Sequence, residues 1–131
     1  MILVDTSAWF ACVVPSDKNH LRASRWLNAN NQVLLTTDYV VDETLTLLRA
    51  RGETVRASNL GEAFFFDALC TIYYLTESDI KETWQVFQRF SDKEWSFTDC
   101  SSKVVMEKLG IDKAFTFDHH FTQFGMGEVL P

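Results

Sequence analysis

Short apolar runs of β-forming residues alternate along this chain with longer stretches of helical periodicity. A short apolar run suits a buried strand, whereas apolar residues spaced at the helical repeat suit a helix with one buried face. The predicted strands are Met1–Val4, Gln32–Leu35, Thr71–Tyr74, Ala114–Phe117 and a last edge strand at Glu128–Leu130. The predicted helices are Ser7–Val14, Leu21–Asn30, Asp38–Arg51, Thr54–Leu69, one that follows Thr76, and one that Thr98 caps and that ends at Leu109.

Start and stop signals delimit several of these helices. Pro15 ends the first helix, and Gly52 and Gly110 follow the ends of two later ones. Thr76 and Asp79 have the spacing of a capping box, in which each side chain accepts a hydrogen bond from the backbone of the other residue. Strands and helices alternate through residues 1–131 in this way, which predicts a single domain.

This alternation predicts an α/β protein whose mainly parallel sheet is covered by helices on both faces. Ligands of such sheets collect at the carboxyl ends of the strands. Asp5 follows the first predicted strand, and Asp118 follows the strand Ala114–Phe117. If those strands are parallel, the two carboxylates lie at the same edge of the sheet.

The composition is that of an ordinary globular protein, with 47% hydrophobic and 23% charged residues. The longest apolar run, Ala8–Val14, is much shorter than the ~20 residues that span a bilayer, so we expect no membrane helix. The stretch Met1–Asp5 lacks the basic region of a signal peptide. Three cysteines without a C-x-x-C pair argue against a disulfide framework or a structural zinc site, and we expect a cytoplasmic protein.

Twelve lysines and arginines stand against eighteen acidic residues, which gives a net charge of −6. This balance disfavours sequence-independent binding to phosphate backbones, where lysine and arginine dominate. A role with nucleic acid therefore requires a local source of positive charge, such as a bound cation or a basic partner chain.

Three of the acids have ordinary structural explanations. Asp5 has the position of a helix N-cap. Asp99 falls in the first turn after Thr98, where the helix dipole favours an acid. Asp118 could begin a turn before His119 and His120.

Glu43 is harder to explain, because it shares the apolar face of its helix with Val40 and Leu47. Its neighbour Asp42 lies instead on a polar face, as a solvated acid does. A buried carboxylate is costly unless a cation, a partner or a raised pKa compensates for it. A structural salt bridge or a shallow boundary position remains the alternative explanation of Glu43.

One hypothesis accounts for all four acids: Asp5, Glu43, Asp99 and Asp118 converge at the carboxyl edge of the sheet around a divalent metal ion. Hard oxygen ligands favour Mg²⁺ or Mn²⁺, which bind phosphates well. Such an ion lowers the pKa of a bound water and neutralises charge on a phosphodiester under attack, so no serine or histidine nucleophile is needed. Without metal, repulsion within the cluster is expected to raise the pKa of at least one acid.

The segments that carry these acids resemble those of the PIN-domain ribonucleases, and among them the VapC-type toxins of prokaryotic toxin–antitoxin pairs. The resemblance covers nearly the whole chain. It rests, in this order and spacing, on Val4–Ala8, Val41–Thr44, Ser96–Ser101 and Thr116–Phe121.

This resemblance implies a three-layer α/β/α fold and a Mg²⁺- or Mn²⁺-dependent endoribonuclease that cuts single-stranded or loop RNA and leaves a 5′-phosphate. It implies that Asp5 and Asp99 are direct metal ligands and that Glu43 and Asp118 complete the catalytic set. Thr6, Ser7 and Thr98 are then candidates for hydrogen bonds to metal-bound waters or to the scissile phosphate. The expected partners are the RNA substrate, a cognate antitoxin protein and a second copy of the chain.

Several aromatic and histidine side chains have no place in this mechanism. We expect His119 and His120 at the surface. Trp95 could stack on a base, but core packing is the commoner role of such a residue. The rings of Phe64–Phe66 cannot all face one core from a helix, so at least one is expected to meet another chain.

Two other classes of protein are possible. A non-catalytic PIN-like module would bind RNA or protein without cutting it. A signalling receiver domain is also a Mg²⁺-binding α/β protein, but it needs an acid pair after the first strand, where this chain has Thr6 and Ser7. Ser7 also breaks the D-x-D pattern of aspartate-based phosphatases. The residues are compatible with tRNA, rRNA or mRNA as the target.

Overall fold

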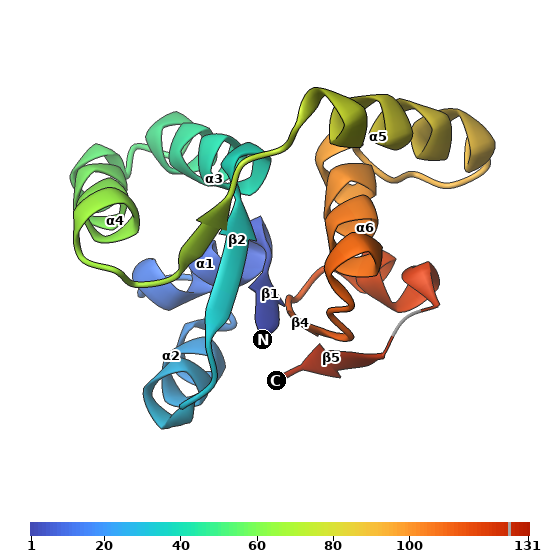
Figure 1. Ribbon diagram of the computed structural model, residues 1–131. Helices are drawn as coiled ribbons and strands as arrows, with labels where there is room; N and C mark the ends of the chain where they lie inside the picture. Colours follow the sequence, from blue (N-terminus) through green and yellow to red (C-terminus); the bar gives the residue numbers. More distant parts are fainter. Residues whose placement is uncertain (126) are drawn as a thin grey trace.

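The computed structural model describes residues 1–125 and 127–131 and contains a five-stranded parallel sheet with strand order β3-β2-β1-β4-β5 (Figure 1). In the central strand, Leu3 pairs with Leu35 on one side and with Ala114 on the other. The five strands are β1 (Ile2–Val4), β2 (Leu34–Thr37), β3 (Thr71–Tyr73), β4 (Lys113–Phe115) and β5 (Glu128–Leu130).

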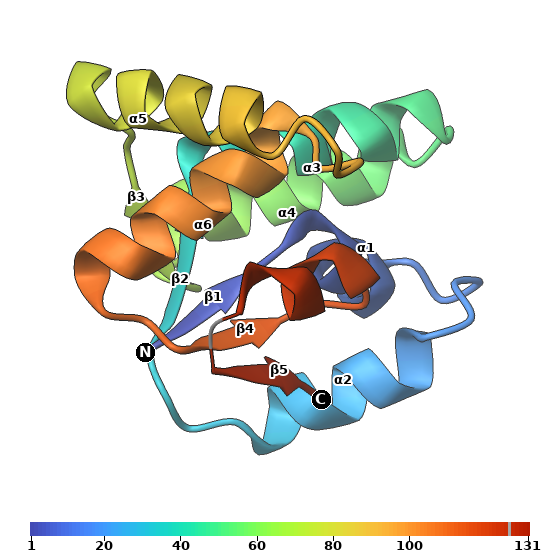
Figure 2. The same cartoon turned by 90° about the vertical axis from the view of Figure 1, so that its right-hand side faces the viewer.

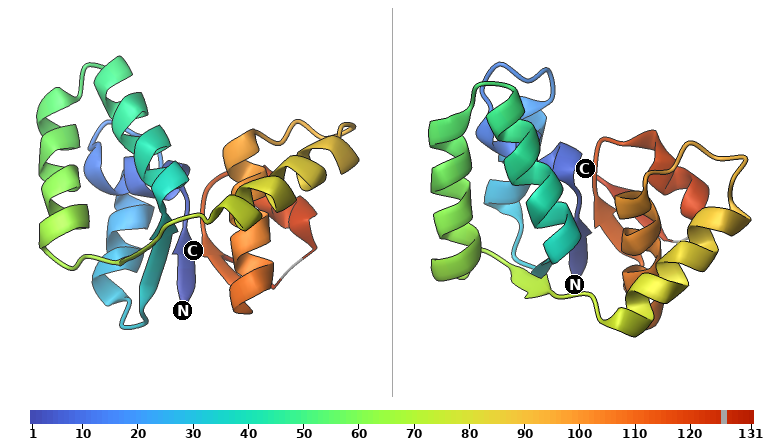
Figure 3. Two further views of the ribbon diagram at one scale, coloured as in Figure 1. Left: turned by 45° about the horizontal axis from the view of Figure 1, so that its top comes forward. Right: turned by 90° about the horizontal axis from the view of Figure 1, so that it is seen from above.

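Helices cover the sheet on both faces, so the predicted three-layer α/β/α architecture is confirmed (Figure 3). One face carries α1 (Thr6–Val13), α2 (His20–Ala29), α3 (Asp38–Ala50) and α4 (Thr54–Phe66). The other carries α5 (Glu77–Arg89), α6 (Phe97–Leu109) and the 3-10 helix η1 (His119–Phe124). No helix of the described residues is both long enough and apolar enough to cross a membrane.

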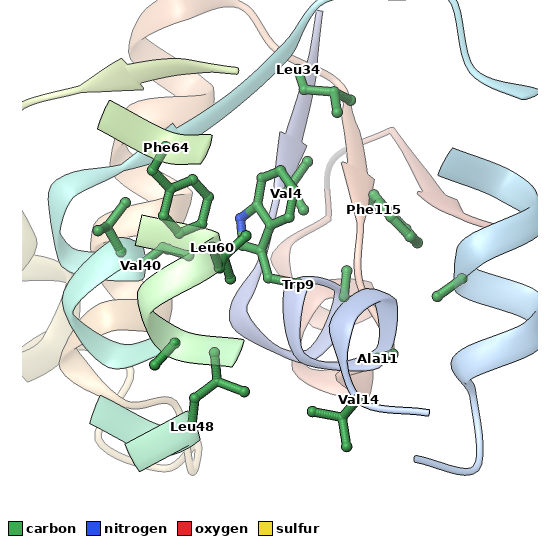
Figure 4. Packing of buried hydrophobic residues seen from close by; sticks show 14 of the residues in the cluster. Val4, Trp9, Ala11, Val14, Leu34, Val40, Leu48, Leu60, Phe64 and Phe115 are labelled. Carbon is green, nitrogen blue, oxygen red and sulfur yellow. The ribbon is translucent and has the colours of Figure 1, made fainter. Parts of the chain in front are cut away.

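Each face of the sheet has its own hydrophobic core, because successive side chains of a strand point to opposite faces. Ile2 and Val4 pack with Trp9 and Phe64 against α1 to α4, as Figure 4 shows for Val4, Trp9 and Phe64. Leu3, between them in β1, packs into the second core with the residues of α6 and η1. The short apolar strands therefore have to be apolar on both faces, which explains why they lack an alternating pattern.

Several predicted boundaries were wrong, among them both ends of the strand expected at Gln32–Leu35, which lies at Leu34–Thr37. The helix expected to reach Leu69 ends at Phe66, and Ala68 takes a positive φ of 52° before the chain enters β3. The strand expected to end at Phe117 ends at Phe115, where its pairings with Val4 of β1 and Leu130 of β5 end. Thr98 was expected to cap α6, but the N-cap of that helix is Ser96.

The aromatic residues are divided between core and surface. Trp95 is buried, and its Nε1 donates a hydrogen bond to Gln123 Oε1 at 2.7 Å, so the core packing role is confirmed and Trp95 cannot stack on a base. Phe64 is buried, whereas Phe65 and Phe66 are exposed on α4. Trp84 on α5 is also exposed.

A buried acid fastens α5 to the rest of the molecule. The carboxylate of Asp79 accepts hydrogen bonds from the Tyr73 hydroxyl at 2.6 Å and from Lys108 Nζ at 2.8 Å, and thereby joins α5 to β3 and α6. Asp79 and Thr76 also form the predicted capping box. Burial alone would raise the pKa of Asp79, but the bonds from Lys108, Tyr73 and Thr76 hold it well below its usual range. The start of α5 is therefore held in one position.

Candidate active site

The four acids singled out in the sequence come from separate segments and meet at one edge of the sheet. Asp5 directly follows β1, Glu43 lies in α3, which follows β2, and Asp118 follows β4. Asp99 lies in the first turn of α6. Because β1, β2 and β4 are parallel, their carboxyl ends share one edge, which lies at the top of the sheet in Figure 1, where α3 begins.

The acids are close enough to repel one another. Burial raises the pKa of Asp5 to about 7, and the charges of Asp99 and Glu43 add to this shift while hydrogen bonds from Ser7 and Thr116 oppose it. Burial raises the pKa of Glu43 as well, with further contributions from Asp99 and Asp118. The pKa of Asp99 is also raised, first by burial and then by Asp118. Burial is thus the first cause of the raised pKa of these three acids, and the repulsion expected from the sequence adds to it.

Asp5 is both the N-cap of α1 and a member of this cluster. Its Oδ2 accepts hydrogen bonds from Ser7 Oγ and from Thr116 Oγ1, each at 3.0 Å. Thr116 itself accepts a bond from the Asp118 backbone N–H at 3.0 Å, and Ser7 Oγ accepts one from the Phe117 N–H at 2.9 Å. These bonds fix Asp118 relative to Asp5. The sequence did not point to Thr116, because the predicted strand ran through it to Phe117.

Asp99 lies at the third position of α6, in a capping box with Ser96. Its Oδ2 accepts the Ser96 N–H at 3.0 Å, and Ser96 Oγ accepts the Asp99 N–H at 3.0 Å. Ser96, and not Thr98, is therefore the N-cap. The reason is the spacing, since only Ser96 stands three residues before an acid that can complete the box.

His120 belongs to the site, contrary to the expectation that both histidines lie at the surface. Its Nδ1 lies 3.3 Å from Asp99 Oδ2 and 3.3 Å from Asp118 Oδ1, and its side chain is only 17% exposed. The side chain of His119 is 79% exposed, as expected. Asp118 Oδ1 accepts the His120 backbone N–H at 2.9 Å, which begins η1 and turns the His120 ring back toward the acids.

Glu43 is half-buried beside two of the predicted secondary residues. The hydroxyls of Thr6 and Thr98 hydrogen-bond its carboxylate and lower its pKa against the effect of burial. Thr6 Oγ1 accepts a bond from Thr44 Oγ1 at 3.1 Å, which ties α1 to α3. Asp42, the next residue toward the N-terminus, is exposed. Glu43 therefore lies beside the other acids, whereas Asp42 faces solvent.

The donor set fits a hard divalent cation. Asp5 and Asp99 bind protein donors through Oδ2, and Asp118 does so through Oδ1. Within residues 1–125 and 127–131, the other oxygen of each carboxylate makes no hydrogen bond, and the one buried side-chain polar atom without a partner there is Ser102 Oγ. These carboxylate oxygens are therefore not taken up by protein donors among the described residues. A cation bound by them would relieve the repulsion that raises these pKa values.

Metal-free stability is expected to fall as the pH rises from about 4 to about 7. Folded Asp5 keeps its proton up to about pH 7, whereas the unfolded chain releases it near 3.8. Between these values the folded state binds more protons, so each rise in pH favours unfolding, and the full penalty persists above about 7. Denaturant unfolding in EDTA across this range, with Asp5→Asn as the control, measures the effect. A constant stability difference between the two proteins would contradict the raised pKa of Asp5.

The chain was compared with known families and proteins. The PIN domain family matches residues 2–125. The chain is 34% identical over 131 residues to the 23S rRNA-specific endonuclease VapC20 of Mycobacterium tuberculosis and covers 99% of that protein. It is 28% identical to a VapC ribonuclease of Archaeoglobus fulgidus, across 92% of this chain and 78% of that protein.

Solved structures agree with these relationships. One is the crystal structure of M. tuberculosis VapC20, which is described as a sarcin–ricin loop cleaving toxin. The match covers 100% of this chain and 100% of VapC20, with a TM-score of 0.93 and 32% identity. FitAcB from Neisseria gonorrhoeae matches 100% of this chain and 97% of its own, with a TM-score of 0.73. At 17% identity, the second match shows the fold alone.

Proposed function

The chain belongs to the PIN-domain family, and we propose that it is a divalent-metal-dependent endoribonuclease acting as the toxin of a toxin–antitoxin pair. The observation that carries this proposal is the cluster of Asp5, Glu43, Asp99 and Asp118 at the carboxyl edge of the sheet, whose charges raise one another's pKa values. The relatives named above as an endonuclease and a ribonuclease support it.

We propose that Asp5 and Asp99 hold Mg²⁺ or Mn²⁺ and that Glu43 and Asp118 complete the set of catalytic acids. The bound ion would supply a Lewis acid that makes water a better nucleophile and neutralises charge on the scissile phosphate. Ser7 and Thr116 orient the Asp5 carboxylate, and Thr6 and Thr98 orient that of Glu43. His120 Nδ1 lies 3.3 Å from both Asp99 Oδ2 and Asp118 Oδ1, where its ring can hydrogen-bond either carboxylate.

The proposed substrate is a loop of ribosomal RNA. VapC20 is described as specific for 23S rRNA and as cleaving the sarcin–ricin loop, and this chain matches it from end to end. Unpaired bases in such a loop can be splayed out and read by a protein, whereas a regular RNA duplex hides its base edges. Because this substrate is cytoplasmic and the three cysteines are free, we place the protein in the cytoplasm.

An antitoxin and a second copy of the chain are the proposed protein partners. A hollow of about 460 Å³ lies between α1, α2 and α4 and is lined by Trp9, Val13, Leu60 and Ala63, among others. Phe66 is exposed on the same helix, α4. An apolar segment of an antitoxin would cover this region in the manner of a helix in a groove.

A cleavage assay tests the proposed function directly. The purified protein is incubated with 23S rRNA and with a synthetic sarcin–ricin loop in Mn²⁺, Mg²⁺ or EDTA, and the ends of the products are mapped. We expect a single cut in the loop, a 5′-phosphate on the downstream fragment, no cleavage in EDTA and recovery when Mn²⁺ is restored. RNA that is bound but stays intact with every metal would indicate a non-catalytic binding module instead.

A further inference from the structure

Four aromatic rings form a continuous row on the surface beside the acids. Tyr39 lies 6.1 Å from Phe97, Phe97 lies 5.8 Å from Phe87, and Phe87 is stacked on Trp84 at 6.0 Å between ring centroids. We call these four residues the aromatic row. Its exposure increases along its length, from the half-buried Tyr39 and Phe97 to Phe87 at 38% and Trp84 at 52%.

The inner end of the aromatic row adjoins the acid cluster. Tyr39 stands one helical turn before Glu43 in α3, so both side chains lie on the same face of that helix. Phe97, the first residue of α6, joins the row through its ring contact with Tyr39 at 6.1 Å. The row therefore runs from the candidate active site to the outer face of α5, which lies along the top of the molecule above α6 in Figure 2.

The outer rings are presented by a firmly held helix. The inward face of α5 carries Asp79, Thr83 and Val86, which are all buried. The bonds of Asp79 to Tyr73 and Lys108 fix the start of the helix. Trp84 and Phe87 are thus not needed to fill the core, and the helix holds them in place at the surface.

Charge decides which kind of ligand these rings suit. The protein carries a net charge of −6, and the acid cluster itself repels phosphates. Among the acids of α5, Asp79 is bonded to Lys108 and Glu77 is ion-paired with Lys81 at 3.2 Å, whereas Glu82 has no ion pair among the described residues. RNA that reaches the site needs a source of affinity other than contacts between lysines or arginines and its backbone. Aromatic rings supply one, because every base can stack on them.

We infer that the aromatic row is a base-stacking platform that binds unpaired nucleotides next to the scissile phosphate. This inference rests on the proposed ribonuclease function and specifies how the substrate is held. The row binds bases by their faces, so it tolerates different sequences and requires that the bases be unpaired. It therefore selects loops over duplexes, whatever the target sequence is.

Binding to short single-stranded RNA tests this inference without cleavage. Fluorescence anisotropy is measured in EDTA for Trp84→Ala and Phe87→Ala, with Trp84→Phe as the conservative variant and Phe66→Ala as a matched exposed ring on α4. We expect Trp84→Ala to weaken binding about 5- to 150-fold. Trp84→Phe is expected to retain most of the affinity, and Phe66→Ala all of it.

A second RNA of the same length, with abasic sites in place of its bases, separates stacking from every other contribution. The wild type is expected to bind it more weakly than intact RNA, whereas Trp84→Ala is expected to bind both about equally. Equal binding of the two RNAs by the wild type would overturn the inference. Conversion of a dimer to a monomer by Trp84→Ala, without any sensitivity to base removal, would show instead that the row is a contact between two copies of the chain.

The outcomes also distinguish failure of this inference from failure of the proposed function. If the wild type neither binds nor cuts RNA, the ribonuclease function itself is wrong. If it binds and cuts RNA and Trp84→Ala leaves both KM and kcat unchanged, only the platform is wrong. A rise in KM without a fall in kcat would agree with a residue that binds substrate outside the acid cluster.

Discussion

Asp99→Asn is expected to reduce RNA cleavage by about three orders of magnitude or more, while leaving the metal-free fold slightly more stable. Asp99 is electrostatically coupled to Asp5, Glu43 and Asp118, so its loss removes a central charge of the site. An asparagine oxygen can still accept the Ser96 N–H that completes the capping box at the start of α6. Relief of repulsion is expected to raise the free energy of unfolding slightly in EDTA.

Asp42→Asn is the matched control for this substitution, because Asp42 is exposed and outside the cluster. Cleavage is followed with the loop RNA under saturating Mn²⁺, and stability by denaturant unfolding in EDTA. The control is expected to change neither quantity. An Asp99→Asn protein that is markedly less stable and yet still cleaves RNA would mean that Asp99 serves the fold and not the chemistry.

Local capping and site formation use the same carboxylates. Asp5 caps α1, Asp99 completes the capping box of α6, and Asp118 begins η1. In each case one oxygen is occupied by protein donors and the other is left without a protein hydrogen bond among the described residues. The structural and the functional explanations of these acids are therefore compatible. The cap fixes the carboxylate, and the fixed carboxylate can then bind a ligand.

The sequence revealed those parts of the site that have a local signal. The short strands were recognisable because a parallel sheet covered on both faces requires apolar runs. Glu43 was recognisable because a carboxylate is out of place in the apolar stripe of α3. The N-cap of α6, which was wrongly predicted at Thr98, also had a signal in the sequence. Ser96 and Asp99 have the same spacing as Thr76 and Asp79, whose capping box was predicted correctly.

Other parts of the site depend on contacts between distant segments. Thr116 and Asp5 are 111 positions apart, and no periodicity or spacing reports a hydrogen bond between them. His120 reaches Asp99 only because η1 begins at once after Asp118 and turns the ring inward. The adjacent His119 has the same local sequence context and points to solvent. The tertiary fold, and not the neighbouring residues in the sequence, therefore decides which of the two adjacent histidines enters the site.

Binding of Mg²⁺ or Mn²⁺ is expected to stabilise the wild type strongly. At about a hundred times the dissociation constant, the metal adds about 2.7 kcal/mol to the free energy of unfolding, or about 10 °C in Tm for a domain of this size. The shift is expected to be larger above about pH 7 than at pH 6, because protonated Asp5 competes with the metal below its raised pKa of about 7. Thermal unfolding with each metal and with EDTA measures both effects.

Two neighbouring acids of α3 provide the control for this experiment. Glu43→Gln is expected to lose most of the metal-induced shift, whereas Asp42→Asn is expected to keep all of it, since only Glu43 is coupled to the other acids. His119→Ala addresses a competing site, because ligand atoms of Asp118, His119 and His120 lie within 4.8 Å of one another. If the shift survives Glu43→Gln and disappears in His119→Ala, the metal binds at the histidine pair, and the four carboxylates must then be explained without it.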